Sequence, residues 1–92
     1  MLRISKTFED NETITLRLDG RLDQASAAEL EENVREHRNG KSRAIILDFA
    51  GVVFVDDAGV ELLRRVKDRR TRITNCSLFV KALISDFLEE GE

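Results

Sequence analysis

The stretch that most constrains the fold is 52–63, VVFVDDAGVELL, in which an apolar run ends on two carboxylates and continues into a helical pattern. This order predicts a strand, a tight turn and a helix. Asp56 precedes the helix, where its side chain can cap the first amides, and Asp57 lies in the first turn, where the helix dipole favours negative charge. Ala58 and Gly59 are small, so we expect an uncovered turn. It could receive a partner, a phosphate or a metal, or be only a well-capped helix.

Alternating apolar and polar residues predict two half-buried strands in a hairpin at the start of the chain. The apolar positions are Leu2, Ile4, Phe8, Ile14, Leu16 and Leu18. Asp19 and Gly20 should bend the chain before a first helix, for which Asp23 suits the N-cap. Apolar residues three and four positions apart continue that helix, and Asn39 and Gly40 are a typical signal for its end.

Two further apolar runs predict buried strand. Residues 44–47, AIIL, are apolar throughout, so we expect a central strand that is covered on both faces. Residues 48–51 should loosen the chain before the second run at 52–55. The helix that follows should bury Leu62, Leu63 and Val66. The basic residues of 64–72 should form its solvated end, although they could instead bind an acidic partner or RNA.

The last part of the chain predicts a short strand and a helix. Ile73 between two polar residues fits an exposed sheet edge. Ser77 lies in a stretch that can cap the last helix, whose apolar stripe we expect to be buried. That stripe consists of Phe79, Val80, Leu83, Ile84, Phe87 and Leu88.

The predicted order is β-β-α-β-α-β-α, a single α/β domain over residues 1–92 with a mixed, mostly parallel four-stranded sheet and flanking helices. The carboxyl ends of parallel strands meet at one edge of a sheet, which brings Asp23 close to Asp56 and Asp57. Open α/β folds usually bind their ligands at that edge. We therefore expect any function there.

Composition excludes several classes of function. The net charge of −3 and the pI of about 5.2 argue against nucleic acid as the main partner. No apolar run approaches the roughly 20 residues of a membrane span, and no signal peptide is visible, so we expect a soluble, cytoplasmic protein without membrane insertion. A single cysteine, Cys76, permits no internal disulfide.

The sequence does not predict an enzyme. Asp23, Asp48, Asp56 and Asp57 raise the possibility of a magnesium site, but a receiver domain needs a second acidic residue beside Asp23 and a lysine after a late strand. A phosphatase of the Asp-x-Asp type has an aspartate where this chain has an alanine. The single histidine, His37, has no catalytic partner in the sequence. We expect neither a metal nor a cofactor.

The chain resembles STAS domains over nearly its whole length. The similarity is carried by LDGRLDQASAAEL (18–30), by AIILDFAGVVFVDDAGVELL (44–63) and by NCSLFVKALI near the end. The second stretch is similar to the family's V-x-F-[IM]-D-S-[ST]-G-[LIV]-x-x-L motif. The resemblance implies a STAS-like fold, a non-catalytic role and partner binding through the loop and helix around that motif. The expected contact residues are Asp23, Asp56, Asp57, Ala58, Gly59, Glu61 and Leu62.

The chain departs from the family at the residue that anti-sigma factor antagonists phosphorylate. Asp57 stands in place of that serine and Ala58 follows it, so residues 52–63 contain no hydroxyl. A phosphoserine carries a charge of about −1.5 to −2, whereas a single carboxylate carries at most −1. We expect a bacterial module that binds a protein without this switch. Its partner could be an anti-sigma or serine-kinase-like regulator, or a transporter ATPase subunit, and it could form a homodimer. Phosphorylation at Ser26 or Ser77 is an alternative, and a magnesium-dependent phosphatase a remote one.

Overall fold

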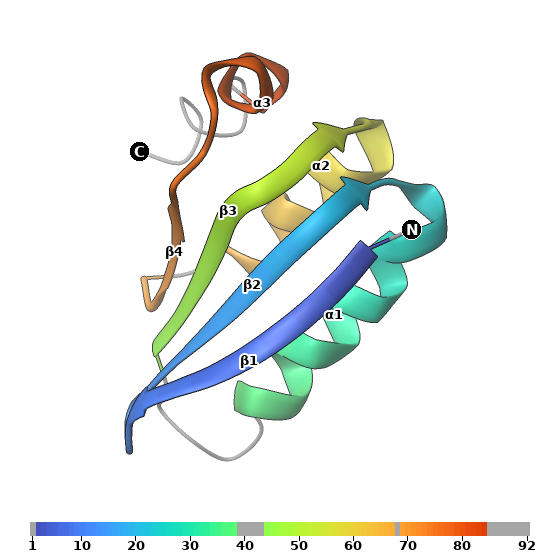
Figure 1. The fold of residues 1–92 in the computed structure, drawn as a ribbon. Helices are drawn as coiled ribbons and strands as arrows, with labels where there is room; N and C mark the ends of the chain where they lie inside the picture. Colours follow the sequence, from blue (N-terminus) through green and yellow to red (C-terminus); the bar gives the residue numbers. More distant parts are fainter. Residues whose placement is uncertain (1, 39–43, 68, 85–92) are drawn as a thin grey trace.

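The computed structural model describes residues 2–38, 44–67 and 69–84. Its elements follow the predicted order (Figure 1). They are β1 (Leu2–Asp10), β2 (Thr13–Leu22), α1 (Gln24–Arg38), β3 (Ala44–Val55), α2 (Asp57–Val66), β4 (Thr71–Thr74) and α3 (Leu78–Leu83). The sheet has the order β1-β2-β3-β4, with β1 antiparallel to β2 and the other pairs parallel. The predicted α/β fold is confirmed. The expected end signal of α1, Asn39 and Gly40, lies outside the described residues.

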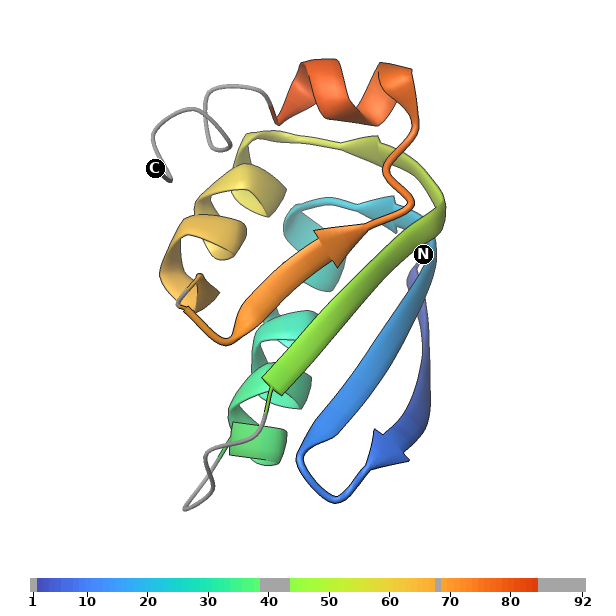
Figure 2. The ribbon, with the colours of Figure 1, turned by 90° about the vertical axis from the view of Figure 1, so that its left-hand side faces the viewer.

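The helices α1 and α2 lie on the same face of the sheet, as Figures 1 and 2 both show. Right-handed connections from β2 to β3 and from β3 to β4 place both helices on one side. The prediction that residues 44–47 are covered on both faces is therefore wrong. Ile45 and Leu47 point into the core and are fully buried, whereas Ala44 and Ile46 point to the open face and are half-buried.

The strand β3 is longer than the sequence suggested. Residues 48–51 do not loosen the chain, because one strand runs through both apolar segments. Its pairing with β2 shifts twice, between Arg17 and Asp19 and between Gly20 and Arg21, and each shift leaves an extra residue on β3. Such bulges bend and twist a strand without ending it. Gly20, with φ of 118°, supplies the conformation that this bend requires.

Contacts along α1 and α2 hold the two helices side by side. The Arg65 guanidinium donates hydrogen bonds to both carboxylate oxygens of Glu31, the shorter at 3.1 Å, which lowers the pKa of Glu31. At the end of the pair, Arg38 Nη1 donates to the carbonyl oxygen of Val66 at 3.1 Å. Part of the basic stretch therefore ties α2 to α1. The predicted buried residues of α2, Leu62, Leu63 and Val66, are all in the core.

The last elements fit the prediction only in part. β4 lies at an edge of the sheet, as predicted, and Ser77 caps α3 by accepting a hydrogen bond from Val80 N. Within the expected stripe, Val80 and Ile84 are buried, but Phe79 is 59% exposed, so that part of the prediction is wrong. Phe87 and Leu88 lie outside the described residues. The spacing of the apolar residues could not predict that Phe79 is exposed, because a helix of six residues packs only one row of side chains against the core.

In β1, too, one residue that was predicted to lie on the apolar side of the strand is exposed. Leu2 is buried and Ile4 half-buried, but Phe8 is 59% exposed, because it lies near the hairpin end, where β1 extends beyond the core. The rings of Phe8 and His37 form a T-shaped pair, with centroids 6.0 Å apart and an angle of 75° between their planes. His37 lies in the last turn of α1.

Candidate functional site

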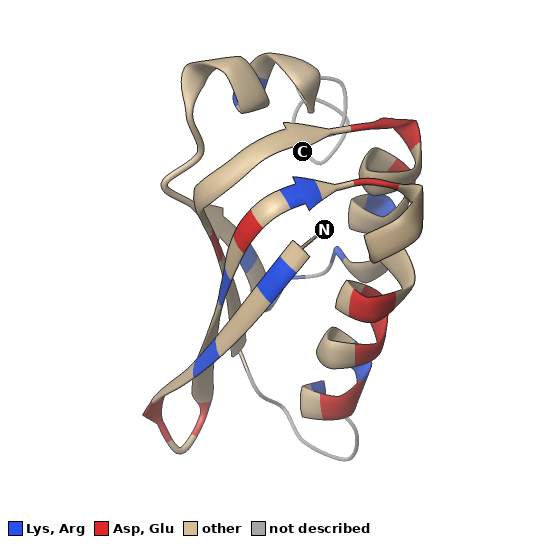
Figure 3. Cartoon of the chain, turned by 45° about the vertical axis from the view of Figure 1, so that its right-hand side comes forward, with Lys and Arg blue, Asp and Glu red and all other residues tan. Residues whose placement is uncertain are grey.

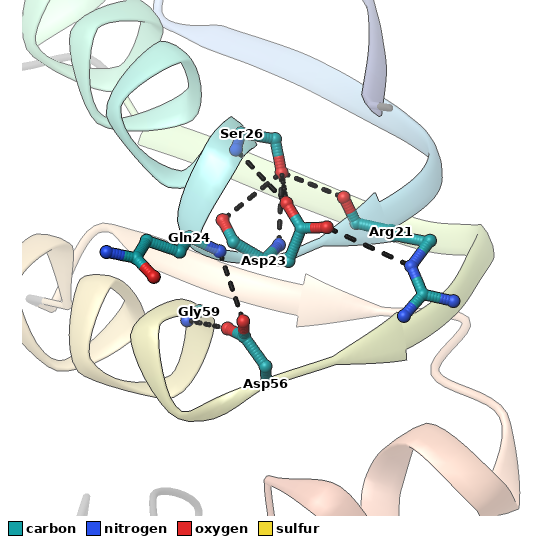
Figure 4. A network of polar contacts seen from close by, with 6 residues as sticks. All are labelled: Arg21, Asp23, Gln24, Ser26, Asp56 and Gly59. Carbon is teal, nitrogen blue, oxygen red and sulfur yellow. Dashed lines mark hydrogen bonds and ion pairs between the residues drawn. The ribbon is translucent and has the colours of Figure 1, made fainter.

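The centre of the candidate site is the carboxylate of Asp56, which serves two helices at once (Figure 4). Its Oδ1 accepts a hydrogen bond from Gly59 N at 2.9 Å, as an N-cap residue of α2 should. Its Oδ2 accepts a hydrogen bond from Gln24 N, the first amide of α1, at 3.1 Å. The predicted cap is confirmed. The second bond fixes the start of α2 against the start of α1.

Asp23 and Ser26 form a reciprocal cap on α1 (Figure 4). Asp23 Oδ1 accepts from Ser26 N at 3.2 Å, and Ser26 Oγ accepts from Asp23 N at 3.0 Å. The Ser26 hydroxyl also donates to the carbonyl oxygen of Arg21 at 2.8 Å. The predicted cap at Asp23 is therefore confirmed. Burial raises the pKa of Asp23, but the hydrogen bonds from Ser26, the charge of the N-terminus and a hydrogen bond from the Ala25 backbone together hold the pKa below its usual value.

The structure separates the seven predicted contact residues into accessible and buried ones. Asp57 and Glu61 are exposed, and Asp23, Asp56 and Ala58 are half-buried at the same edge of the molecule. In Figure 3, acidic residues gather at the start of α2 and along α1. We call the five accessible residues the acidic edge. The adjacent helix starts bring together residues that are more than 30 positions apart in the sequence.

Two of the predictions need correction. Gly59 is not in an uncovered turn but buried: a Cβ there would lie 2.5 Å from the carbonyl oxygen of Leu22 and 2.8 Å from Val55 Cγ1. Its small size lets α2 approach the end of β2. Leu62 is fully buried in the core, so its side chain belongs to the interior rather than to a contact surface. The helical period placed Leu62 correctly inside, and only the resemblance placed it at a contact.

Sequence reasoning missed the apolar residues beside the acidic edge. Val53 is 59% exposed, although it belongs to an apolar strand. The Arg21 guanidinium lies over the ring of Phe54, 4.6 Å from its centroid, and its Nε pairs with Asp23 Oδ2 at 3.8 Å. The only signal in the sequence was the four-residue apolar run itself, which gives no indication that a bulge leaves two consecutive members outside the core.

The acidic side chains near the strand ends do not converge. Asp48 Oδ1 accepts hydrogen bonds from Ala50 N at 2.9 Å and from Asn75 Nδ2 at 3.1 Å, which lowers the pKa of Asp48 and keeps this carboxylate between β3 and the turn after β4. Among the described residues, no group of three or more His, Cys, Asp or Glu side chains could hold a metal ion. Over the same residues, no helix is long and apolar enough to cross a membrane.

Comparison with solved structures finds several chains with this fold. The anti-sigma factor antagonist SpoIIAA in its unphosphorylated form superposes with a TM-score of 0.75 at 23% identity, covering 97% of this chain and 83% of that one. The crystal structure of Mglu gives a TM-score of 0.69 at 21% identity over 80% of this chain, which spans only 20% of that protein. Murine Slc26a9, an anion transporter, gives 0.66 at 18% identity, with 92% of this chain and 18% of that chain covered.

Identities this low establish the fold and nothing further. A search of curated protein sequences gives no match. The sequence model of the family described as "Mlab, STAS domain" matches residues 5–88, which is nearly the entire chain. The chain therefore belongs to the STAS domain family.

Proposed function

We propose that this STAS domain is a non-catalytic, cytoplasmic regulatory module of the anti-sigma factor antagonist type, which binds a protein partner through the acidic edge. The observation that carries the proposal is the pair of hydrogen bonds made by Asp56. They hold the start of α2 rigidly against α1 while Asp57 and Glu61 remain exposed. A surface that is rigid before binding loses little conformational entropy on association.

The same geometry supports a module without a phosphate switch at this loop. Asp57 occupies the exposed first turn of α2, where the helix dipole favours a negatively charged side chain. A kinase has no hydroxyl to modify between residues 52 and 63. The domain would then be controlled by the abundance or the state of its partner rather than by modification of this loop.

The burial of Ser26 argues against this residue as the alternative phosphorylation site. Ser26 is only 4% exposed, and its hydroxyl is both donor and acceptor in the α1 cap. Ser77 is exposed, and its hydroxyl caps α3. The alternative mechanism therefore rests on Ser77.

Two kinds of partner remain for the proposal. The likeness to SpoIIAA favours an anti-sigma or serine-kinase-like regulator. The likeness to a segment of an anion transporter favours a transport role, in which the domain would bind a transporter ATPase subunit. Either partner would be retained by the purified domain, and mass spectrometry of the retained protein distinguishes the two.

The test compares two identical charge reversals at opposite ends of the molecule. Glu61→Arg changes the acidic edge, and Glu12→Arg changes an exposed residue of the β1–β2 hairpin. With the purified partner, we expect Glu61→Arg to weaken binding by at least about tenfold and Glu12→Arg to leave it within about twofold. Equal affinities for both variants, with unchanged circular dichroism, would refute binding through this edge.

A further inference from the structure

The second bulge of β3 turns apolar surface outward next to the acidic edge. The register passes from Gly20–Val52 to Arg21–Phe54, so Val53 is the extra residue that has no partner on β2. Val53 is 59% exposed, as expected beside the buried Val52, and the extra residue delays the return to the core until Val55, which is buried. The half-buried Phe54 therefore does not enter the core, and two consecutive apolar residues face away from it.

Phe54 continues this surface and is held in place from one side. Arg21 lies over its ring at 4.6 Å from the centroid, and Asp23 holds the same guanidinium by an ion pair of 3.8 Å. Stacking on an aromatic face and pairing with a carboxylate restrict an otherwise flexible arginine. The ring is half-buried, so part of it remains accessible.

Backbone contacts connect this apolar surface to the acidic edge. Asp56 N donates to the carbonyl oxygen of Leu22 at 3.1 Å, and Leu22 is the residue between Arg21 and Asp23. Asp56, the N-cap of α2, therefore follows Val53 and Phe54 by two residues, and Asp23 lies beside it just after the end of β2. Among these side chains the carboxylates outnumber the single guanidinium, which is itself paired.

We propose that Val53 and the Arg21-stacked Phe54 are the apolar centre of the docking surface, and that the protein partner places an apolar side chain there between lysine or arginine residues. This inference rests on the proposed function and names the chemistry of its partner. Protein interfaces typically have an apolar centre, which carries most of the affinity, inside a polar rim. Here the rim is acidic, so the matching rim of the partner is basic.

The first experiment locates the contact by crosslinking. The photoreactive residue p-benzoylphenylalanine is placed at Val53, and at Phe8 as a control, since both positions are 59% exposed. Phe8 pairs with Ile14 at the hairpin end of β2, whereas Val53 lies beside Gly20 and Arg21 near the other end of that strand. We expect a crosslink from position 53 to an apolar segment of a second protein that has lysine or arginine beside it, and no such product from position 8. A crosslink to a second copy of this chain, or to an acidic segment, would overturn the inference.

The second experiment measures affinity with the purified crosslinked protein. Val53→Asp should weaken binding by at least about tenfold, and Phe8→Asp by no more than about twofold. If Val53→Asp disturbs the circular dichroism spectrum, Val53→Ser replaces it, with a loss of at least about threefold expected. If Glu61→Arg weakens binding while the Val53 variants do not, this inference fails and the proposed function stands. If none of them weakens binding, both fail.

Discussion

The carboxylate of Asp56 accepts a hydrogen bond from the backbone amide of Gln24 at 3.1 Å and thereby joins the starts of two helices that are separated by a whole strand. The same carboxylate caps its own helix through Gly59 N at 2.9 Å. One side chain thus satisfies amides of both helix ends that form the acidic edge. The position of Asp57 relative to Asp23 depends on this residue.

Replacing Asp56 should therefore lower the free energy of unfolding by more than the loss of a single helix cap does. We expect Asp56→Ala to lower the free energy of unfolding by about 1–3 kcal/mol, because two helix amides lose their acceptor. Asp57→Ala, one residue further along on the exposed side, should lower it by less than about 1 kcal/mol. Urea denaturation of both variants provides the comparison. Equal effects would contradict the bridging role of Asp56.

Gly59 should tolerate no side chain. In Gly59→Ala the new Cβ would lie 2.5 Å from the carbonyl oxygen of Leu22, so α2 has to move away from β2. We expect a loss of about 1–3 kcal/mol in the free energy of unfolding, and a greater loss for Gly59→Arg. Ala58→Ser is the control at the neighbouring half-buried position, with less than about 0.5 kcal/mol expected. If the Gly59→Ala variant unfolds at the same temperature as the wild type, α2 is packed less tightly against β2 than the distances indicate.

Ser26 should behave as a structural residue. Ser26→Ala removes the acceptor for Asp23 N and the donor for the Arg21 carbonyl, so we expect a loss of about 1–3 kcal/mol in the free energy of unfolding. Incubation of the folded wild-type protein with a promiscuous serine kinase, followed by peptide mapping, should give no phosphate at Ser26. Phosphate at Ser26 under conditions in which the protein stays folded would disprove its burial.

Acid should destabilise the protein in part through Asp48. The hydrogen bonds from Ala50 N and Asn75 hold the pKa of Asp48 below its ordinary value of 3.8 in the folded state. A depressed folded pKa gives stability that is present above the unfolded pKa and lost as the pH falls through the folded pKa. Between pH 5 and about 2.5 we expect Asp48→Asn to lose less stability than wild type. If the curves of unfolding free energy against pH for Asp48→Asn and the wild type were parallel, they would contradict this role of Asp48.

Local signals predicted most of the fold. Apolar period and capping residues gave the order of the elements, and the Asp56 cap followed from one residue placed before a helical pattern. The prediction that residues 44–47 of β3 are covered on both faces was wrong, because an apolar run does not show on which face of the sheet the helices pack. That outcome follows from the handedness of two connections, which acts over the whole chain.

The candidate site was harder to predict because its details depend on contacts between distant segments. The bond from Gln24 to Asp56 joins residues 32 positions apart, and the burial of Gly59 depends on the end of β2. The exposure of Val53 depends on how β3 pairs with β2. None of these relationships leaves a pattern in the local sequence, whereas the charge of Asp57 and Glu61 could be read directly.

The most direct test of the central claim is a map of backbone amide shifts in the ¹⁵N-labelled domain as purified partner is added. Docking on the acidic edge predicts that the largest changes fall on Gln24 and on residues 56–61, with the amides of the β1–β2 hairpin unchanged. Changes confined to that hairpin or to β4, with those of residues 56–61 unmoved at saturation, would contradict the account.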